Sequence, residues 1–312
     1  MGCLQAQYAP SMYIGLWSRI EGLKRDEVTR ALERKSAVQG TLMRSTIHLV
    51  SKADYWPLAI AVRETRREHW KRTRKNHSAR AVAAAAKRLR SRFAEGALSR
   101  AELSEALDKD PVMVNAVGLW LDLVRVPPSG TWERRRADLY AAAEDWLGPP
   151  PGKLSPEQAL DRLVRRYLTG FGPASLAQIA NWAGLHPKRV APALERIRLR
   201  RFVNEGGDEL VDLPGAPLPD PETPAPVRFL PTWDATLLVH ARATGVLPEE
   251  HRPQVFNTKT PQSMPTFLVD GEVAGSWRYE KGRIGIEPFG KLTKTARREL
   301  DAEAERLAAF HG

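Results

Sequence analysis

Apolar residues recur at three- and four-residue intervals in several stretches of the chain, which is the spacing of the buried face of an amphipathic helix. Val28, Ala31 and Leu32 show this spacing first. Several of the stretches open on serine or proline, residues that favour the first turn of a helix. The pattern predicts helices over residues 24–35, 78–93, 100–107, 110–124, 155–172, 174–184, 186–197 and 293–310.

Residues 38–51 change to a strand-like pattern. Their Thr, Ile and Val content together with Gly40 predicts a short turn and a strand or hairpin. Because alternate side chains of a strand point to opposite faces, Arg44 and His48 would share one partly polar face. The other face would pack on a core; its members are Met43, Ser45, Ile47 and Leu49.

Two parts of the chain repeat one order of predicted elements, namely three helices followed by a two-stranded loop. Ser99, with Glu102 as the second half of a capping box, begins the second helix of one part. Ser175 holds the corresponding position about 76 residues later. This order is typical of a winged-helix unit.

A proline-rich segment at residues 214–226 separates these parts from a β-rich end. Asp270-Gly271 and Lys281-Gly282 are turn signals there and predict a small antiparallel sheet or partial barrel. We therefore expect an α+β fold, mainly helical, with tandem winged-helix units followed by a C-terminal β-barrel-like part. The expected boundaries are 1–77, 78–150 and 151–213 for three units, 214–226 for the linker, and 227–312 for the C-terminal part with its terminal helix.

The formal charge of +11 and the sequence pI near 9.9 favour an anionic partner. Nucleic acid, an anionic membrane surface and an acidic protein all fit the charge alone. The single cysteine, Cys3, excludes an intramolecular disulfide and a thiolate metal cluster. The sequence contains no run of eighteen apolar residues, no phosphate-binding glycine loop, no metal-ligand spacing and no serine-nucleophile motif. We expect a cytoplasmic protein without metal or cofactor.

Cationic residues gather in two places. Residues 63–80 interleave arginine and lysine with His69 and Trp70, a composition that fits a surface following a phosphate backbone, although a solvated helix face is the ordinary alternative. The predicted loop after the first group of helices has a rim of arginines around a tryptophan. The candidate DNA contacts of this loop are Arg125, Trp132, Arg134, Arg135 and Arg136.

Two glutamines, Gln5 and Gln7, stand one residue apart near the start of the chain, next to an aromatic residue. In an extended segment their amides would project from the same face. Neutral amides are costly to bury without partners. The pair therefore belongs either to a frayed, exposed terminus or to a polar site.

Five phrases together resemble the winged helix DNA-binding domain protein family, which includes bacterial DNA glycosylases that unhook interstrand crosslinks, of the azinomycin-resistance type. The phrases are LQAQYAPSMYIGLWSRIEG, GTLMRSTIHLVSKADYWPL, VRVPPSGTWERRRADLY, LPTWDATLLVHA and PTFLVDGEVAGSW, in the family's order. The resemblance implies three tandem winged-helix units and a β-barrel-like part around duplex DNA. Members carry further helices before the QAQ phrase, so we expect the first unit to be N-terminally incomplete here.

The family's catalytic motif is Gln, an apolar residue, then Gln or Asp, which the resemblance places on Gln5 and Gln7. It implies a monofunctional glycosylase acting on N-alkylated purines of the N7-guanine type or unhooking crosslinks, as a monomer at the nucleoid. Arg44 and the arginines of the predicted loop would hold phosphates, and His48 would lie near the lesion. The alternative is a non-catalytic winged-helix DNA-binding protein or transcriptional regulator. A membrane-surface or acidic-protein binder would explain the charge but not the repeated order of elements.

Overall fold

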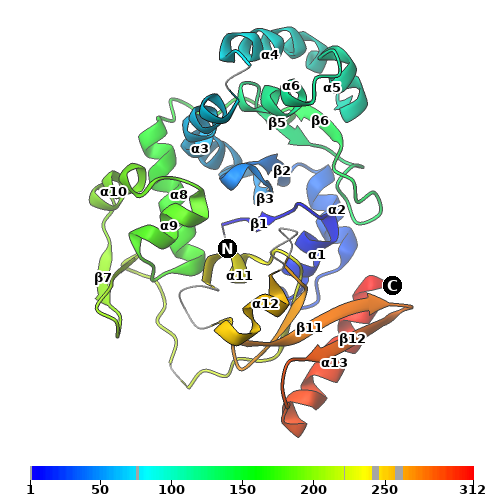
Figure 1. Ribbon diagram of the computed structural model, residues 1–312, viewed down its shortest axis with the longest axis vertical. Helices are drawn as coiled ribbons and strands as arrows, with labels where there is room; N and C mark the ends of the chain where they lie inside the picture. Colours follow the sequence, from blue (N-terminus) through cyan, green and yellow to red (C-terminus); the bar gives the residue numbers. More distant parts are fainter. Residues whose placement is uncertain (1, 75–76, 221, 241–245, 257–262) are drawn as a thin grey trace. The chain divides into compact units, whose positions relative to one another are not determined.

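The computed structural model describes residues 2–74, 77–220, 222–240, 246–256 and 263–312 (Figure 1). The chain forms two compact units. The large unit consists of Met1–Ala9 and Thr29–Ala216, and the small unit of Pro10–Val28 and Pro217–Gly312. The chain therefore enters the small unit early, returns to the large unit, and ends in the small one.

An antiparallel sheet of six strands lies at the centre of the large unit, in the order β1-β3-β2-β5-β6-β4. β1 pairs with β3, and β3 with β2. In the same way β4 pairs with β6, and β6 with β5. The pairing of β2 with β5 joins the two sets of three strands. The strands are β1 Leu4–Gln5, β2 Ala37–Thr41, β3 Ile47–Ser51, β4 Leu98–Ser99, β5 Leu123–Arg125 and β6 Leu139–Ala142. The segments predicted as the first two units thus share one sheet.

The helices that accompany this sheet begin where the sequence places capping residues. Ser99 and Glu102 form the predicted capping box at the start of α5 (Arg100–Ala106). Ser78 caps α4 (Ala79–Ala94), as the pattern at residues 78–93 predicts. The other helices here are α2 Arg25–Glu33, α3 Lys52–Thr73, α6 Pro111–Ala116, η2 Val117–Leu119 and α7 Ala143–Leu147. The helix predicted over 110–124 is therefore too long, because its last residues join the sheet as β5.

Residues 155–213 confirm the predicted order of three helices and a hairpin. Ser155 and Ser175 form capping boxes at the first two helices. Tyr167 and Trp182 pack edge to face with ring centroids 5.2 Å apart and join two of the helices in one core. The elements are α8 Pro156–Phe171, α9 Leu176–Ala183, α10 Pro187–Arg196, β7 Arg200–Val203 and β8 Glu209–Asp212.

The prediction for residues 38–51 is right in the hairpin and wrong in its turn. Gly40 lies inside β2, where the Tyr55 ring stands 2.6 Å from the place of a β-carbon, so only glycine fits. The turn is instead a short 3₁₀ segment, Met43–Ser45, in which Arg44 and Ser45 have φ of 51° and 58°. Because the strand is interrupted there, the predicted alternation of faces from residue 42 to residue 49 does not hold.

The small unit contains an antiparallel sheet in the order β12-β11-β10-β9, with β12 and β9 as edges among the described residues. This corrects the expected barrel-like part: the sheet is open. At the start of the β-rich end, only Arg228–Leu230 forms a strand, and Ala235–His240 is a helix. The elements are α1 Ala9–Trp17, β9 Arg228–Leu230, α11 Ala235–His240, η3 Glu249–His251, α12 Arg252–Val255, β10 Thr266–Val269, β11 Glu272–Glu280, β12 Arg283–Pro288 and α13 Lys294–His311.

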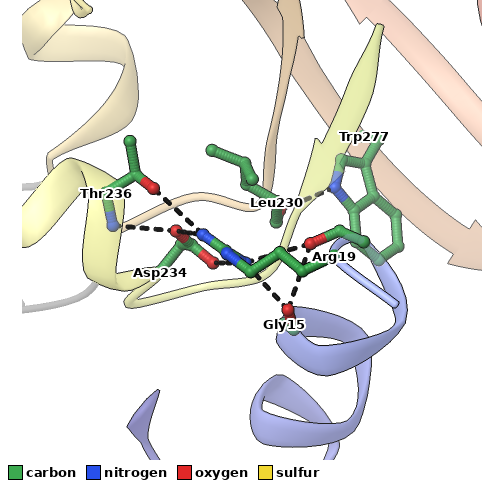
Figure 2. Close-up of polar contacts among 7 residues, drawn as sticks. Gly15, Arg19, Leu230, Asp234, Thr236 and Trp277 are labelled. Carbon is green, nitrogen blue, oxygen red and sulfur yellow. Dashed lines mark hydrogen bonds and ion pairs between the residues drawn. The ribbon is translucent and has the colours of Figure 1, made fainter. Parts of the chain in front are cut away.

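An ion pair to a buried carboxylate joins the two sequence segments of the small unit (Figure 2). Arg19 follows α1 and makes two hydrogen bonds to the buried Asp234 carboxylate, of 2.9 and 2.6 Å. Asp234 also accepts from the backbone N–H of Thr236 at the start of α11. Nearby, the Trp277 indole N–H donates to the Leu230 carbonyl. The Arg19 bonds fix the segment after α1 against the start of α11, and the Trp277 bond fixes β11 against β9.

Candidate functional site

Gln5 lies at the edge of the large unit's sheet. It is the last residue of β1 and pairs in register with His48 of β3, so the two side chains lie on one face. The residue is half-buried. Its side-chain Oε1 accepts a hydrogen bond of 3.5 Å from Nη2 of Arg44, which belongs to the β2–β3 turn.

Gln7 lies two residues further, beyond the end of β1 and just before α1, and is exposed. Its Oε1 accepts from the backbone N–H of Ile47 at 3.3 Å, while the Ala6 N–H donates to the Ile47 carbonyl at 2.8 Å. The expectation of a fully extended segment thus holds for Gln5 only. Both amide oxygens are nevertheless held by the same β2–β3 hairpin.

Arg44 lies between the glutamines and the helices of residues 155–213. Nη1 donates to the carbonyl of Trp182 at the end of α9, and Nη2 donates to Gln5. Burial lowers the pKa of its guanidinium, and the nearby Cys3 partly opposes that effect. The sequence suggested a phosphate contact for Arg44, but the structure gives both ends of its guanidinium protein partners.

His48 is 1% exposed and lies beneath the glutamine edge. Its Nδ1 contacts the Thr46 carbonyl at 3.0 Å, an arrangement in which Nδ1 carries the proton. Nε2 has no hydrogen-bond partner among the described residues. Burial, reinforced by Arg44, lowers the pKa of His48 to about 3, so the imidazole is neutral at physiological pH.

Hydrogen bonds in its interior fix the conformation of the loop between β5 and β6, residues 126–138. The buried Ser129 hydroxyl donates to the Arg136 carbonyl at 2.7 Å and accepts from the N–H groups of Asp138 and Leu139. Gln39 of β2 donates to the Gly130 carbonyl, and Gly130 adopts φ +70°. The inner hydrogen bonds leave the arginines on the outside of the loop.

The loop presents Arg134, Arg135 and Arg136 as exposed cations, as the sequence predicts. Arg135 donates to the hydroxyl of Tyr8 at 3.1 Å, and Arg136 pairs with Asp138. Tyr8 is 41% exposed and directly follows Gln7. Its contact brings the basic loop next to the glutamine pair, a role that the sequence pattern does not signal.

Arg125 and Trp132, the other two candidate DNA contacts of this loop, make contacts within the protein. Arg125 donates to the Thr41 hydroxyl at 2.8 Å and lies over the Tyr140 ring, and burial lowers the pKa of its guanidinium. Trp132 is 5% exposed, with Arg135 above its ring. These positions favour packing, and direct DNA contacts of Arg125 and Trp132 stay predictions.

The arginine-rich part of α3 faces inward more than its composition suggests. Arg66 donates to the Thr41 carbonyl and Arg67 to the Leu119 carbonyl, both at 2.7 Å, and burial lowers the pKa of Arg66 to about 10. Trp70 is buried and packs edge to face on Trp120. Arg66, Arg67 and Trp70 therefore make contacts within the protein, whereas Lys71 and Arg72 of the same helix are exposed, and phosphate binding along α3 stays a prediction.

A groove of about 970 Å³ opens between α3 and the α9–α10 turn, and Arg44 lines it. Lys71 and Arg72 of α3 are exposed along it, and Arg189 of α10 lines it while paired with Glu68. A groove with this excess of cations attracts anionic ligands. Arg44 thus contacts Gln5 and also borders a cationic groove.

In the part of the chain that the structure describes, no group of three His, Cys, Asp or Glu side chains is placed to hold a metal ion. Cys3 is buried, and burial raises the pKa of its thiol to about 12, so it is no nucleophile at neutral pH. None of the described helices is long and apolar enough to cross a membrane.

The chain is similar to known proteins in sequence and in fold. The chain is similar to an interstrand DNA cross-link repair glycosylase of Streptomyces sahachiroi, with 26% identity over 181 residues, and the match spans 54% of this chain and 46% of that protein. The fold is similar to the solved structure of the Streptomyces sahachiroi DNA glycosylase AlkZ, with a TM-score of 0.83 and 20% identity over 99% of this chain and 88% of that one. The sequence profile of the AlkZ-like DNA glycosylases matches residues 1–310, and the chain belongs to that family.

Proposed function

We propose that this protein is a monofunctional DNA glycosylase that hydrolyses the N-glycosidic bond of N-alkylated purines, with N7-alkylguanine as the type substrate. Family membership supports the reaction class. The placement of Gln5 and Gln7 is the observation that carries the proposal. Their amide oxygens are both fixed by the β2–β3 hairpin, and Tyr8 and Arg135 join this edge to a loop of exposed cations.

Two neutral amides suit this substrate because its leaving group is already cationic. When the C1′–N9 bond breaks, its electron pair neutralises the alkylated base, so no general acid is needed. Water adds to C1′ and its proton passes to solvent. A carboxamide oxygen has two acceptor sites. Arg44 occupies one acceptor site of the Gln5 oxygen, and the Ile47 N–H occupies one of the Gln7 oxygen. The second acceptor site of each oxygen orients the water and faces the positive charge that develops on the sugar.

Duplex DNA is the partner in this proposal, bound by a monomer at the nucleoid. The exposed cations of residues 126–138 hold phosphates, and Arg134 is the member whose guanidinium makes neither a hydrogen bond nor an ion pair among the described residues. The two amides act without metal or cofactor, because the reaction needs neither a Lewis acid nor an electron acceptor. Unhooking of N7-guanine crosslinks follows from the same bond cleavage.

The order of elements supports a tandem winged-helix organisation within this proposal. A strand, two helices and two strands follow one another in β1, α1, α2, β2 and β3, and again in β4, α5, α6, β5 and β6. Both sets pair their strands in the same way. A third unit would be α8, α9, α10 and the β7–β8 hairpin, with the boundaries expected from the sequence.

Base release from alkylated DNA tests the proposal. Purified protein in excess is incubated with duplex containing a single 7-methylguanine, and free base and abasic sites are measured in the same sample. We expect equal amounts of both, with no strand cleavage until alkali is added. A duplex with an N7-guanine interstrand crosslink, run in parallel, tests unhooking.

Undamaged duplex of the same sequence is the control and should release no base. A protein that footprints one specific promoter sequence but releases no base from either damaged substrate would be a regulator, and the proposal would be wrong.

A further inference from the structure

The β2–β3 turn combines features that a simple phosphate contact does not need. Arg44 and Ser45 both have left-handed backbone conformations, with φ of 51° and 58°. For residues other than glycine such conformations cost about 1 kcal/mol or more each and persist only where surrounding contacts enforce them. They aim the Arg44 side chain toward Trp182 and Gln5.

Gly184, the residue after α9, packs directly on this turn. It has φ +68°, and a β-carbon there would lie 3.0 Å from the Arg44 backbone nitrogen and 3.0 Å from its Cγ. The carbonyl of Trp182, two residues earlier, accepts from Arg44 Nη1. The end of α9 therefore holds both the backbone and the head group of Arg44.

We propose that Arg44 is a positioning residue for Gln5 and not a phosphate contact. Its guanidinium joins the Trp182 carbonyl to Gln5 Oε1, so that the end of α9 sets the direction of the Gln5 carboxamide. The donated hydrogen bond fixes which end of the amide is oxygen and leaves the second acceptor site of Oε1 facing outward. The planar fork of arginine presents a separate nitrogen to each partner, whereas lysine has a single ammonium nitrogen.

This inference rests on the proposed function for its kinetic test, which separates rate from affinity. In single-turnover release of 7-methylguanine at saturating protein, Arg44→Ala should lower the rate constant by about 10- to 100-fold, because a small misplacement of a catalytic group costs that much. The Kd for the duplex and its salt dependence should change little. Arg44→Lys should be intermediate. Arg134→Ala should show the opposite pattern, with weaker binding and a shallower salt slope.

A pair of glycine variants tests the same contact without removing a charge. Gly184→Ala should lower the rate constant in the same direction as Arg44→Ala, because its methyl group displaces the turn. Gly207→Ala is the matched control: it has φ +84° at the tip of the β7–β8 hairpin, and nothing among the described residues lies within 4 Å of its β-carbon position. It should introduce similar backbone strain and leave the rate constant unchanged. Thermal melts establish that each variant is folded.

A readout independent of activity is the side-chain amide signal of Gln5 in nitrogen-15 NMR of the full chain. We expect a restrained, dispersed signal in the wild type and a sharp, averaged one in Arg44→Ala. If Arg44→Ala instead weakens DNA binding and lowers the salt slope by about one unit at an unchanged rate and an unchanged Gln5 signal, Arg44 is a phosphate contact and the inference is wrong. If the wild type releases no base, the proposed function fails, and the Gln5 signal still decides the role of Arg44.

Discussion

At the scale of single residues, environment and not residue type decides what the cations of this protein can do. Arg134 is exposed on a loop, Arg66 is turned inward onto the Thr41 carbonyl, and Arg44 spans two protein partners. Burial lowers the pKa of Arg66 to about 10 and also lowers that of Arg44, although both stay charged at neutral pH. Net charge therefore overstates the cationic surface that is exposed to an anionic ligand.

The lowered pKa of His48 predicts that the free energy of unfolding depends on pH in the acidic range. Its pKa is about 3 in the folded protein against an ordinary value of 6.5. Between those values the unfolded chain binds a proton that the folded chain does not, so stability falls as pH drops from 6.5 toward 3 and is independent of this group above 6.5. One group contributes at most about 1.4 kcal/mol per pH unit.

Urea unfolding at about pH 4.5, 5.5, 6.5 and 7.5, values that span the ordinary pKa of histidine, measures this contribution. The wild type should lose free energy of unfolding more steeply below that pKa than His48→Asn does, while both have the same slope above it. Parallel curves over the whole range would show that His48 is accessible to protons in the fold.

At the scale of elements, the sequence predicts most helices because their starting signals are local. Ser99 with Glu102 and Ser175 with Gln178 form the capping boxes that set two helix starts. The β2–β3 turn is different, because its left-handed conformations are not signalled by either residue type. The contacts that enforce them come from the end of α9, far along the chain. For the same reason the pair of glutamines could be found as a motif, but its partners could not.

The basic loop of residues 126–138 gives a prediction at this scale. Ser129→Ala removes one donor and leaves the partly buried N–H groups of Asp138 and Leu139 without their partner. We expect a loss of about 1–3 kcal/mol in the free energy of unfolding, together with weaker binding of duplex DNA because the arginines are no longer held together. Chemical denaturation and fluorescence anisotropy measure the two effects.

Ser91→Ala is the matched control, since Ser91 is exposed and its hydroxyl donates to the Arg88 carbonyl of its own helix. It should change neither stability nor affinity by a measurable amount. Full affinity in Ser129→Ala would mean that the loop's geometry does not matter for binding.

At the scale of the whole molecule, the formal charge of +11 predicts strongly salt-dependent DNA binding. Replacing Arg134, Arg135 and Arg136 together by alanine should lower the slope of log K against log salt by about 0.9 for each phosphate that the protein no longer neutralises. Replacing the inward Arg66 and Arg67 should leave the slope unchanged. Binding titrations between roughly 50 and 200 mM salt, the range over which phosphate contacts weaken visibly, make the comparison. Equal slopes for the wild type and the triple variant would place the DNA elsewhere.

Whether the two amides at the sheet edge perform the chemistry is decided by single-turnover release of 7-methylguanine. The wild type is compared with the double variant Gln5→Ala, Gln7→Ala at saturating protein. We expect the double variant to bind the duplex with the wild-type Kd but to release base at least about 100-fold more slowly, because groups that stabilise the transition-state charge have been removed. Release at the wild-type rate by a folded double variant would contradict this mechanism.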